Sequence, residues 1–386
     1  MAIDIYAAEF QEDPYPAYAE LRDREPVYRE PRYGAYLLTR FDDVLAVLRD
    51  PAIWSSASGP APMPGKFGGA APVLASTDPP YHDQLRGLVN RAFTPRRVAA
   101  HAGRIEEIAR ERVAELSPEG FDLVPGLSVP LPVTVIAELL GVPPERQRDF
   151  RRWSDAFVGL LENPPTPGLL ASAQELVGYF QELVAERRRR PQEDLVSGLL
   201  EAELDGRRLE PAELDGFFIM LLVAGNETTT NLISNQLHLL AARPELWKAL
   251  REDRSLVPAA IEETVRWDGP VQNLGREATR DVTLRGVEIP AGGRVVVSFG
   301  AADRDPAEFD APEEYRLERG QTRSLGFGHG VHFCLGAGLA RLEGRIALNA
   351  LLDRFETIEP GTEPPQRLHS TVIRGFESLT LSGSSA

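Results

Sequence analysis

The stretch FGHGVHFCLG, residues 327–336, concentrates residue types that could do chemistry. It holds the only cysteine of the chain, Cys334, together with two of the six histidines and three glycines. A thiol with an ordinary pKa of about 8.5 stays protonated at neutral pH unless a metal or positive surroundings stabilise the thiolate. Because a helix is predicted to begin just after the cysteine, the N–H groups of Leu335 and Gly336 are expected to point at the sulfur.

Three interpretations of Cys334 remain open from the residues alone. It could be a buried structural cysteine in a glycine-rich turn. It could bind zinc together with His329 and His332, although such a site requires a fourth ligand. It could also be the axial thiolate of a haem iron, where it favours O–O cleavage. A single cysteine excludes an intramolecular disulfide, which fits a reducing compartment.

A second candidate, AGNETT, residues 224–229, interrupts an apolar stretch from Ala212 to Ala242 that is predicted to be helical. A carboxylate in an apolar helix is costly unless it has a partner or a role, so Glu227 is a candidate for chemistry. The alternative is a simple polar interruption, in which the hydroxyl of Thr228 bonds back to a carbonyl one turn earlier.

The run from Phe327 to Gly336 resembles the haem-binding signature of the cytochrome P450 family at every fixed position, and other family marks follow in order along nearly the whole chain. The resemblance implies a haem b with Cys334 as the iron ligand. It also implies that Glu227 and Thr228 deliver protons to bound dioxygen. The other haem-site residues that it implies are Ala224 and Gly225 beside the iron, and Phe327, Gly328 and Gly336 around the sulfur.

The same resemblance assigns charged residues elsewhere in the chain. The haem propionates are expected to bind four cationic or imidazole side chains: His82, Arg86, Arg276 and His332. By resemblance, Glu263 and Arg266, in EETVR, form a buried structural network with Arg319, although by itself such a pair is an ordinary surface feature.

Two positions depart from the family pattern. Ser324 stands where many relatives have His, and Asp303 replaces the usual Asn. Neither is expected to touch the chemistry.

The implied function is a soluble bacterial-type haem-thiolate monooxygenase. It would take electrons from a ferredoxin and its reductase, activate O2 and insert one oxygen atom into a hydrophobic small molecule, by hydroxylation or oxidative dealkylation. The alternatives are a peroxide-driven haem peroxygenase and a non-catalytic haem sensor. The expected substrate contacts are mostly apolar: Met220, Val223, Ala224, Val271 and Val372.

The overall charge bears on partners and location. A formal net charge of −16 disfavours nucleic acid, whose phosphates would be repelled. The first thirty residues carry charges throughout and lack the apolar core of a signal peptide or anchor, so we expect a cytoplasmic protein without membrane attachment. The ferredoxin is expected to dock near basic residues on the cysteine side: Arg96, Arg97, Arg341 and Arg345.

The expected architecture is mainly α with small β-sheets (α+β), the cytochrome P450 fold, in a single domain covering 1–386. The long apolar helix is expected to lie centrally, over the haem. A hairpin turning at Arg32–Gly34 and a last hairpin in TVIRGFESLTLS, residues 371–382, are also predicted. The approximate ranges are helical at 80–270 and 336–354, and β-rich at 26–60, 276–300 and 367–383.

Overall fold

The computed structural model describes the whole chain apart from residues 1–2, 64–73, 151, 154–155, 157–165 and 320–322. The described part is mostly helical with small sheets, which confirms the expected fold class. The described α-helices are α1 (Ala8–Glu12), α2 (Tyr15–Arg24), α3 (Phe41–Arg49), α4 (Tyr81–Ala92), α5 (Pro95–Ala100), α6 (Ala102–Ala114), α7 (Pro130–Leu139), α9 (Pro167–Arg189), α10 (Leu195–Glu201), α11 (Pro211–Ala241), α12 (Pro244–Glu252), α13 (Val257–Asp268), α14 (Phe299–Ala302) and α15 (Ala337–Arg354).

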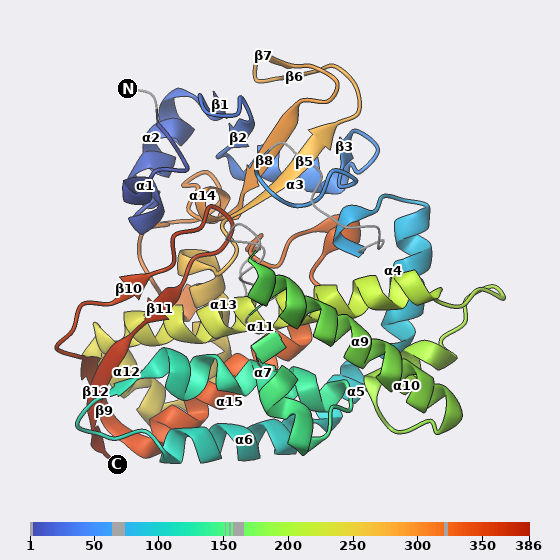
Figure 1. The fold of residues 1–386 in the computed structure, drawn as a ribbon. Helices are drawn as coiled ribbons and strands as arrows, with labels where there is room; N and C mark the ends of the chain where they lie inside the picture. Colours follow the sequence, from blue (N-terminus) through green and yellow to red (C-terminus); the bar gives the residue numbers. More distant parts are fainter. Residues whose placement is uncertain (1–2, 64–73, 151, 154–155, 157–165, 320–322) are drawn as a thin grey trace.

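In the described ranges the strands form one five-stranded sheet and three smaller ones. The larger sheet lies at the top of Figure 1, beside α2 and α3 and above most of the other helices, in the order β1-β2-β8-β5-β3. The strands are β1 (Val27–Arg29), β2 (Tyr36–Leu38), β3 (Trp54–Ser55), β4 (Phe121–Asp122), β5 (Asn273–Ala278), β6 (Val282–Leu284), β7 (Val287–Ile289), β8 (Arg294–Ser298), β9 (Phe355–Pro360), β10 (Gln366–Arg367), β11 (Phe376–Ser378) and β12 (Thr380–Ser385).

Helix α11 is the central element, as its apolar sequence predicted, and α7, α13 and α15 all pack against it. Pro211 occupies its first turn, where the missing N–H costs nothing. A capping box between Glu210 and Glu213 satisfies two further backbone donors. Within the described ranges, no helix combines the length and apolar character that a membrane span requires.

The predicted N-terminal hairpin is confirmed, since β1 pairs with β2 in antiparallel register. The predicted C-terminal hairpin is wrong. Strand β11 pairs with β10, whereas β12 pairs with β9 and β4. Only Leu379 separates β11 from β12, which is too few residues for a turn, so the chain stays extended and changes partners. Strands β4 and β9 lie outside the ranges predicted to be β-rich.

Candidate functional site

A tight loop between the short 3-10 helix Gly330–His332 and α15 carries Cys334. Gly328 and Gly330 adopt left-handed φ angles of 73° and 69°, which side chains disfavour. A Cβ at Gly330 would also lie 2.6 Å from the carbonyl oxygen of Leu48, so this glycine lets the loop pack against the end of α3. The N–H of Cys334 donates to the carbonyl of Phe327 at 2.9 Å, which closes the loop.

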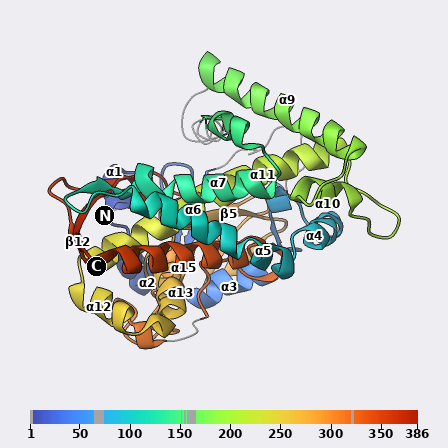
Figure 2. The same ribbon diagram turned by 90° about the horizontal axis from the view of Figure 1, so that it is seen from below.

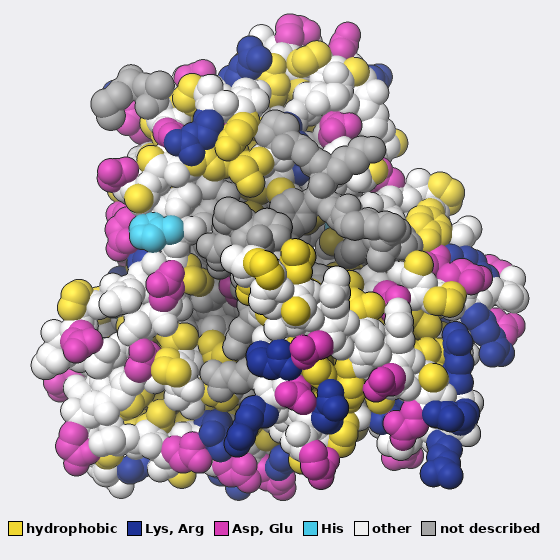
Figure 3. Space-filling view, viewed as in Figure 1, with side chains coloured by type: hydrophobic (Ala, Val, Ile, Leu, Met, Phe, Trp, Pro, Cys, Tyr) yellow, Lys and Arg dark blue, Asp and Glu magenta, His cyan; other side chains and the backbone are white. Residues whose placement is uncertain are grey.

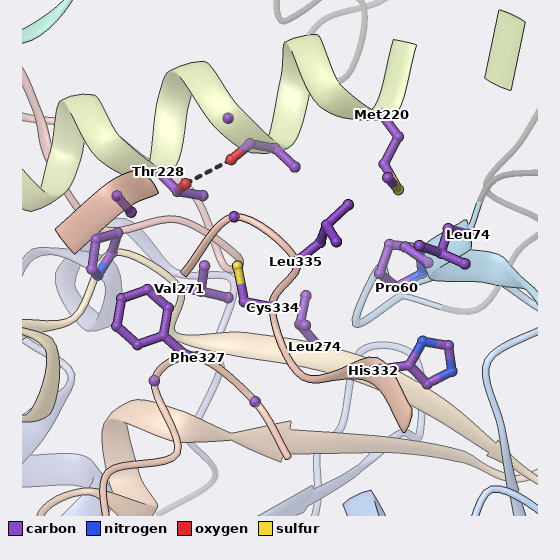
Figure 4. Close-up of a pocket in the computed structure, with 18 of the residues that line it drawn as sticks. Pro60, Leu74, Met220, Thr228, Val271, Leu274, Phe327, His332, Cys334 and Leu335 are labelled. Carbon is purple, nitrogen blue, oxygen red and sulfur yellow. Dashed lines mark hydrogen bonds between the residues drawn. The ribbon is translucent and has the colours of Figure 1, made fainter. Parts of the chain in front are cut away.

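The sulfur of Cys334 lies across a cavity from α11 (Figure 4). Burial raises the pKa of the thiol, whereas the N–H groups of Gly336 and Ala337 and the charges of Arg86 and Arg341 lower it. Gly336 was predicted to be one of these donors. The second is Ala337 rather than Leu335, whose side chain lines the cavity. The surroundings therefore favour a thiolate once a bound cation offsets the cost of burial.

The opposite wall of the cavity is α11, where Ala224, Gly225 and Thr228 line the space. A Cβ at Gly225 would lie 2.5 Å from Cδ1 of Ile136, so this glycine also permits close packing of α7. The hydroxyl of Thr228 donates to the carbonyl of Ala224 at 2.6 Å (Figure 4). That is the back-bonded geometry of the alternative interpretation. Glu227, in the same turn of α11, is not among the described residues that line the cavity.

A cluster of basic side chains borders the cavity away from α11. Arg86 on α4, Arg276 on β5 and His332 line the cavity, and the ring of buried His82 lies 4.4 Å from that of His332. Among the described residues, neither arginine has a carboxylate within ion-pair distance. The structure thus brings the four predicted propionate-binding residues together.

The electrostatics of this cluster favour the binding of an anion. Burial and the charge of Arg294 lower the pKa of Arg276 to about 10. Burial, followed by Arg276, His82 and Arg86, lowers the pKa of His332 to about 3. The Nε2 atom of His82 is buried without a hydrogen-bond partner among the described residues. Such a set gains stability from a ligand that carries negative charge.

His329 and His332 do not join Cys334 in a metal site. Nε2 of His329 accepts a hydrogen bond from Arg49 at 3.3 Å, and Nε2 of His332 lies 3.1 Å from the hydroxyl of Ser56. No group of three or more His, Cys, Asp or Glu among the described residues could hold a metal ion. The geometry therefore does not support the zinc interpretation.

The predicted charged network is assembled and buried. Arg266 donates two hydrogen bonds of 2.8 Å to the carboxylate of Glu263, and Arg319 adds a third at 3.0 Å. Arg266 also donates to the carbonyl of Asp303 at 2.9 Å. The side chains of Glu263 and Arg266 are at most 1% exposed, so the full pairing is required to keep their charges buried.

The two departures from the family pattern are partners of each other. The buried carboxylate of Asp303 accepts hydrogen bonds from the hydroxyl of Ser324 and the N–H of Leu325, both at 2.7 Å. Leu325 lies two residues before Phe327, so the pair anchors the beginning of the cysteine loop. The sequence pattern had marked each position separately and gave no sign of the contact.

Three of the five predicted substrate contacts line the cavity: Met220, Ala224 and Val271. Val372 is not among the described lining residues, although its carbonyl accepts from the N–H of Gln272, next to Val271. The side chain of Val223 lies outside the described part, as do residues 64–73 of the Gly- and Pro-rich segment 59–76. The cavity has a volume of about 270 Å³. Its lining also includes Pro60 and Leu74, from the segment 59–76, and Leu274, both regions where substrate contacts are expected by resemblance, together with three apolar residues that were not predicted: Phe93, Leu232 and Phe299.

Comparisons with known proteins agree on one family. A family model described as "Cytochrome P450" matches residues 165–380. The chain is 39% identical to the "Putative cytochrome P450 123" of Mycobacterium tuberculosis, covering 99% of this chain and 97% of the relative. It is 39% identical to "Cytochrome P450 monooxygenase PikC" of Streptomyces venezuelae, covering 97% and 92%. The solved structure of cytochrome P450 CYP109Q5 from Chondromyces apiculatus matches with a TM-score of 0.93 and 40% identity, covering 100% of this chain and 98% of that one.

Proposed function

Since the chain belongs to the cytochrome P450 family, whose members are monooxygenases, we propose that it binds a haem b and that Cys334 is the residue that would bind its iron. The proposed reaction inserts one atom of dioxygen into a hydrophobic small molecule. The other atom leaves as water and consumes two protons and two electrons.

One observation carries this proposal: the half-buried sulfur of Cys334 faces α11 across a cavity that is also lined by Arg86 and Arg276, for which the described residues provide no carboxylate partner. A haem fits this donor set. It offers a metal to Cys334 and two propionate carboxylates to Arg86, Arg276, His82 and His332. Pairing with carboxylates would offset the burial that lowers the pKa of both arginines.

When bound, the haem supplies the activation of dioxygen and the transfer of one oxygen atom. The chain supplies the surroundings. The N–H groups of Gly336 and Ala337 stabilise negative charge on the sulfur of Cys334. The ring of Phe327 packs beneath the guanidinium of Arg341, 4.2 Å from its carbon, and beside the apolar cluster of Leu232, Ile261 and Val265. These contacts hold the loop and limit the access of water to the sulfur.

The proton donor proposed for the cavity is Thr228. Its hydroxyl donates to Ala224 in this structure, but rotation about χ1 would turn the same O–H into the cavity that the residue lines. Glu227 precedes it on α11 and lies outside the lining, where its carboxylate can exchange protons with the surroundings and pass them to the threonine.

The proposed substrate is a hydrophobic small organic molecule. The lining beside α11 is apolar, including Met220, Leu274 and Val271, and an apolar ligand gains by leaving water for such a surface. On the face shown in Figure 3, hydrophobic side chains gather near the centre, and charged side chains are spread around the periphery.

The proposed electron donor is a ferredoxin with its reductase. Arg96 and Arg97, at the start of α5, are exposed and available to an acidic partner. Arg341 was also expected to contact the ferredoxin, but its guanidinium instead forms an ion pair with Glu262 through two hydrogen bonds of 2.6 and 2.9 Å. The attraction is therefore proposed to rest mainly on the α5 arginines.

A peroxide-driven reaction is the second candidate, because Thr228 is back-bonded and Glu227 is not among the described residues that line the cavity. The two candidates differ in the oxidant. Product formation would be measured with NADPH, ferredoxin, reductase and O2, and in parallel with hydrogen peroxide alone. The monooxygenase proposal expects faster turnover in the first reaction. Turnover only with peroxide would overturn it in favour of the second candidate.

A further inference from the structure

A buried group of three charged side chains and one tyrosine lies behind one wall of the cavity. We name it the Asp268 cluster: Asp268, Arg374, Arg367 and Tyr15. One oxygen of Asp268, the last residue of α13, accepts hydrogen bonds from the hydroxyl of Tyr15 at 2.5 Å and from Nε of Arg374 at 2.6 Å. The other oxygen lies 3.7 Å from Arg367. The cluster therefore joins the N-terminal segment, the end of α13 and the β10–β11 region.

The cluster is tied to the wall through the backbone. The carbonyl of Pro270 accepts from the N–H of Arg374 at 2.7 Å, and the carbonyl of Val372 accepts from the N–H of Gln272 at 2.8 Å. Val271 and Ile373 form an isolated bridge between these two contacts. Residues 270–272 thus lie as a short ladder against residues 372–374, while the side chain of Val271 lines the cavity (Figure 4).

The same cluster fixes this wall relative to α11, which forms the opposite wall. The amide of Asn235 on α11 donates both to the carbonyl of Asp268 at 2.8 Å and to the carbonyl of Arg374 at 3.0 Å. The amide of Gln272 donates to the hydroxyl of Tyr15 at 3.3 Å. A change in the cluster would therefore alter the spacing between Val271 and α11.

We propose that Asp268 and Arg374 are positioning residues for substrate selection: they hold the Val271 wall at a set distance from α11 and so determine which ligand shapes bind between that wall and α11. Neither residue is among the described residues that line the cavity, so they act through Val271. This inference rests on the proposed function, since it concerns ligands held between that wall and a haem.

The charges in the Asp268 cluster explain why it should control the position of the Val271 wall. Two arginines share the single carboxylate of Asp268, and the side chains of Asp268 and Arg374 are 4% and 7% exposed. Removing the carboxylate leaves two buried cations that repel each other, and buried unpaired charges drive local rearrangement. The segment that carries Arg367 and Arg374 would shift, and the Val271 ladder would shift with it.

The test uses the ferric holoenzyme and two probes that ligate haem iron, imidazole and 4-phenylimidazole. Imidazole is small enough to bind without reaching the wall, whereas the phenyl ring extends toward it. For Asp268→Asn, the ratio of the two dissociation constants, measured by optical titration, is expected to change by about fivefold or more.

Asp194→Asn is the matched control. Asp194 pairs with Arg187 in a similarly buried site between α9 and α10, with side chains 6% and 4% exposed, and neither residue is among the described lining residues. For Asp194→Asn, the ratio of the two dissociation constants should stay within about twofold of the wild-type ratio, even if this variant loses as much stability as Asp268→Asn does.

Tyr15→Phe is a milder variant that removes one hydrogen bond from Asp268 and one from Gln272. If Asp268→Asn does not fold, Tyr15→Phe provides the test. We expect it to change the ratio of the two dissociation constants by at least about threefold. An unchanged ratio in the cluster variants, or an equal change in Asp194→Asn, would overturn the inference. Absence of any imidazole spectrum in wild type would instead refute the haem proposal itself.

Discussion

Replacing Asp303 by Asn is expected to remove a pH dependence of stability that this protein carries at the beginning of its cysteine loop. The Asp303 side chain is fully buried, and burial raises its pKa from 3.8 to about 7 despite the hydrogen bonds from Leu325 and Ser324 and the charge of Arg266. Asn retains the geometry, since its oxygen can accept from the N–H of Leu325 and its amide can donate to Ser324. The substitution therefore removes titration without opening a cavity.

The sign follows from the direction of the shift. A carboxyl whose pKa is raised by folding contributes stability that is complete below its unfolded pKa and is lost as pH rises through the folded value. Between pH 5 and pH 7 each unit removes about 1.4 kcal/mol, and above pH 7 the loss levels off. Asp303 should thus lower the free energy of unfolding of wild type by about 2 to 3 kcal/mol between pH 5 and pH 8.

Urea unfolding followed by circular dichroism, at pH 5 and at pH 8, measures this difference. The stability of Asp303→Asn relative to wild type should rise by about 2 to 3 kcal/mol between the two pH values. Asp268→Asn is the control, because the pKa of Asp268 is lowered to about 2 and its titration lies below this window. The loss in free energy of unfolding caused by Asp268→Asn should be equal at both pH values. A relative stability of Asp303→Asn that does not change with pH would refute the reasoning.

Three further predictions concern the cofactor, the proton path and the partner. Arg276→Ala, and to a lesser degree Arg86→Ala, should speed haem transfer to apomyoglobin by about tenfold or more, since a propionate loses its buried partner; unchanged transfer rates in both would refute the assignment. Thr228→Ala should still consume NADPH but form product at a yield about tenfold or more lower, with the electrons recovered as hydrogen peroxide, whereas Glu227→Gln should mainly slow turnover; full coupling in Thr228→Ala would exclude the proposed donor. Electron transfer from an acidic ferredoxin should slow as salt rises, and this dependence should weaken in Arg96→Ala; a rate that is independent of salt would contradict electrostatic docking there.

Local sequence patterns predicted those parts of the molecule that depend on local chemistry. The apolar run from Ala212 to Ala242 predicted α11 within one residue at each end. The cysteine signature predicted a tight glycine loop, and two of its glycines do adopt left-handed φ. In both cases the local conformation depends on residues that are close together in the sequence, so a short stretch is enough to predict it.

Contacts between residues that are far apart in the sequence were harder to predict. The parallel register of β2 with β8, which joins Tyr36 to Val295, has no local signal. The predicted terminal hairpin failed for a related reason: the alternating pattern around Phe376 and Leu381 indicates extended chain but does not say which strands it pairs with. The contact of Asp303 with Ser324 likewise became visible only in the structure.

The ligation of haem iron by Cys334 is the central claim, and the spectrum of the reduced, carbon monoxide-bound holoenzyme tests it most directly. Wild type should show the strongly red-shifted Soret band of thiolate ligation. Cys334→His, which keeps a ligand at the same loop position, should retain haem but lose that band. Survival of the band in Cys334→His, or its absence from haem-loaded wild type, would contradict the assignment.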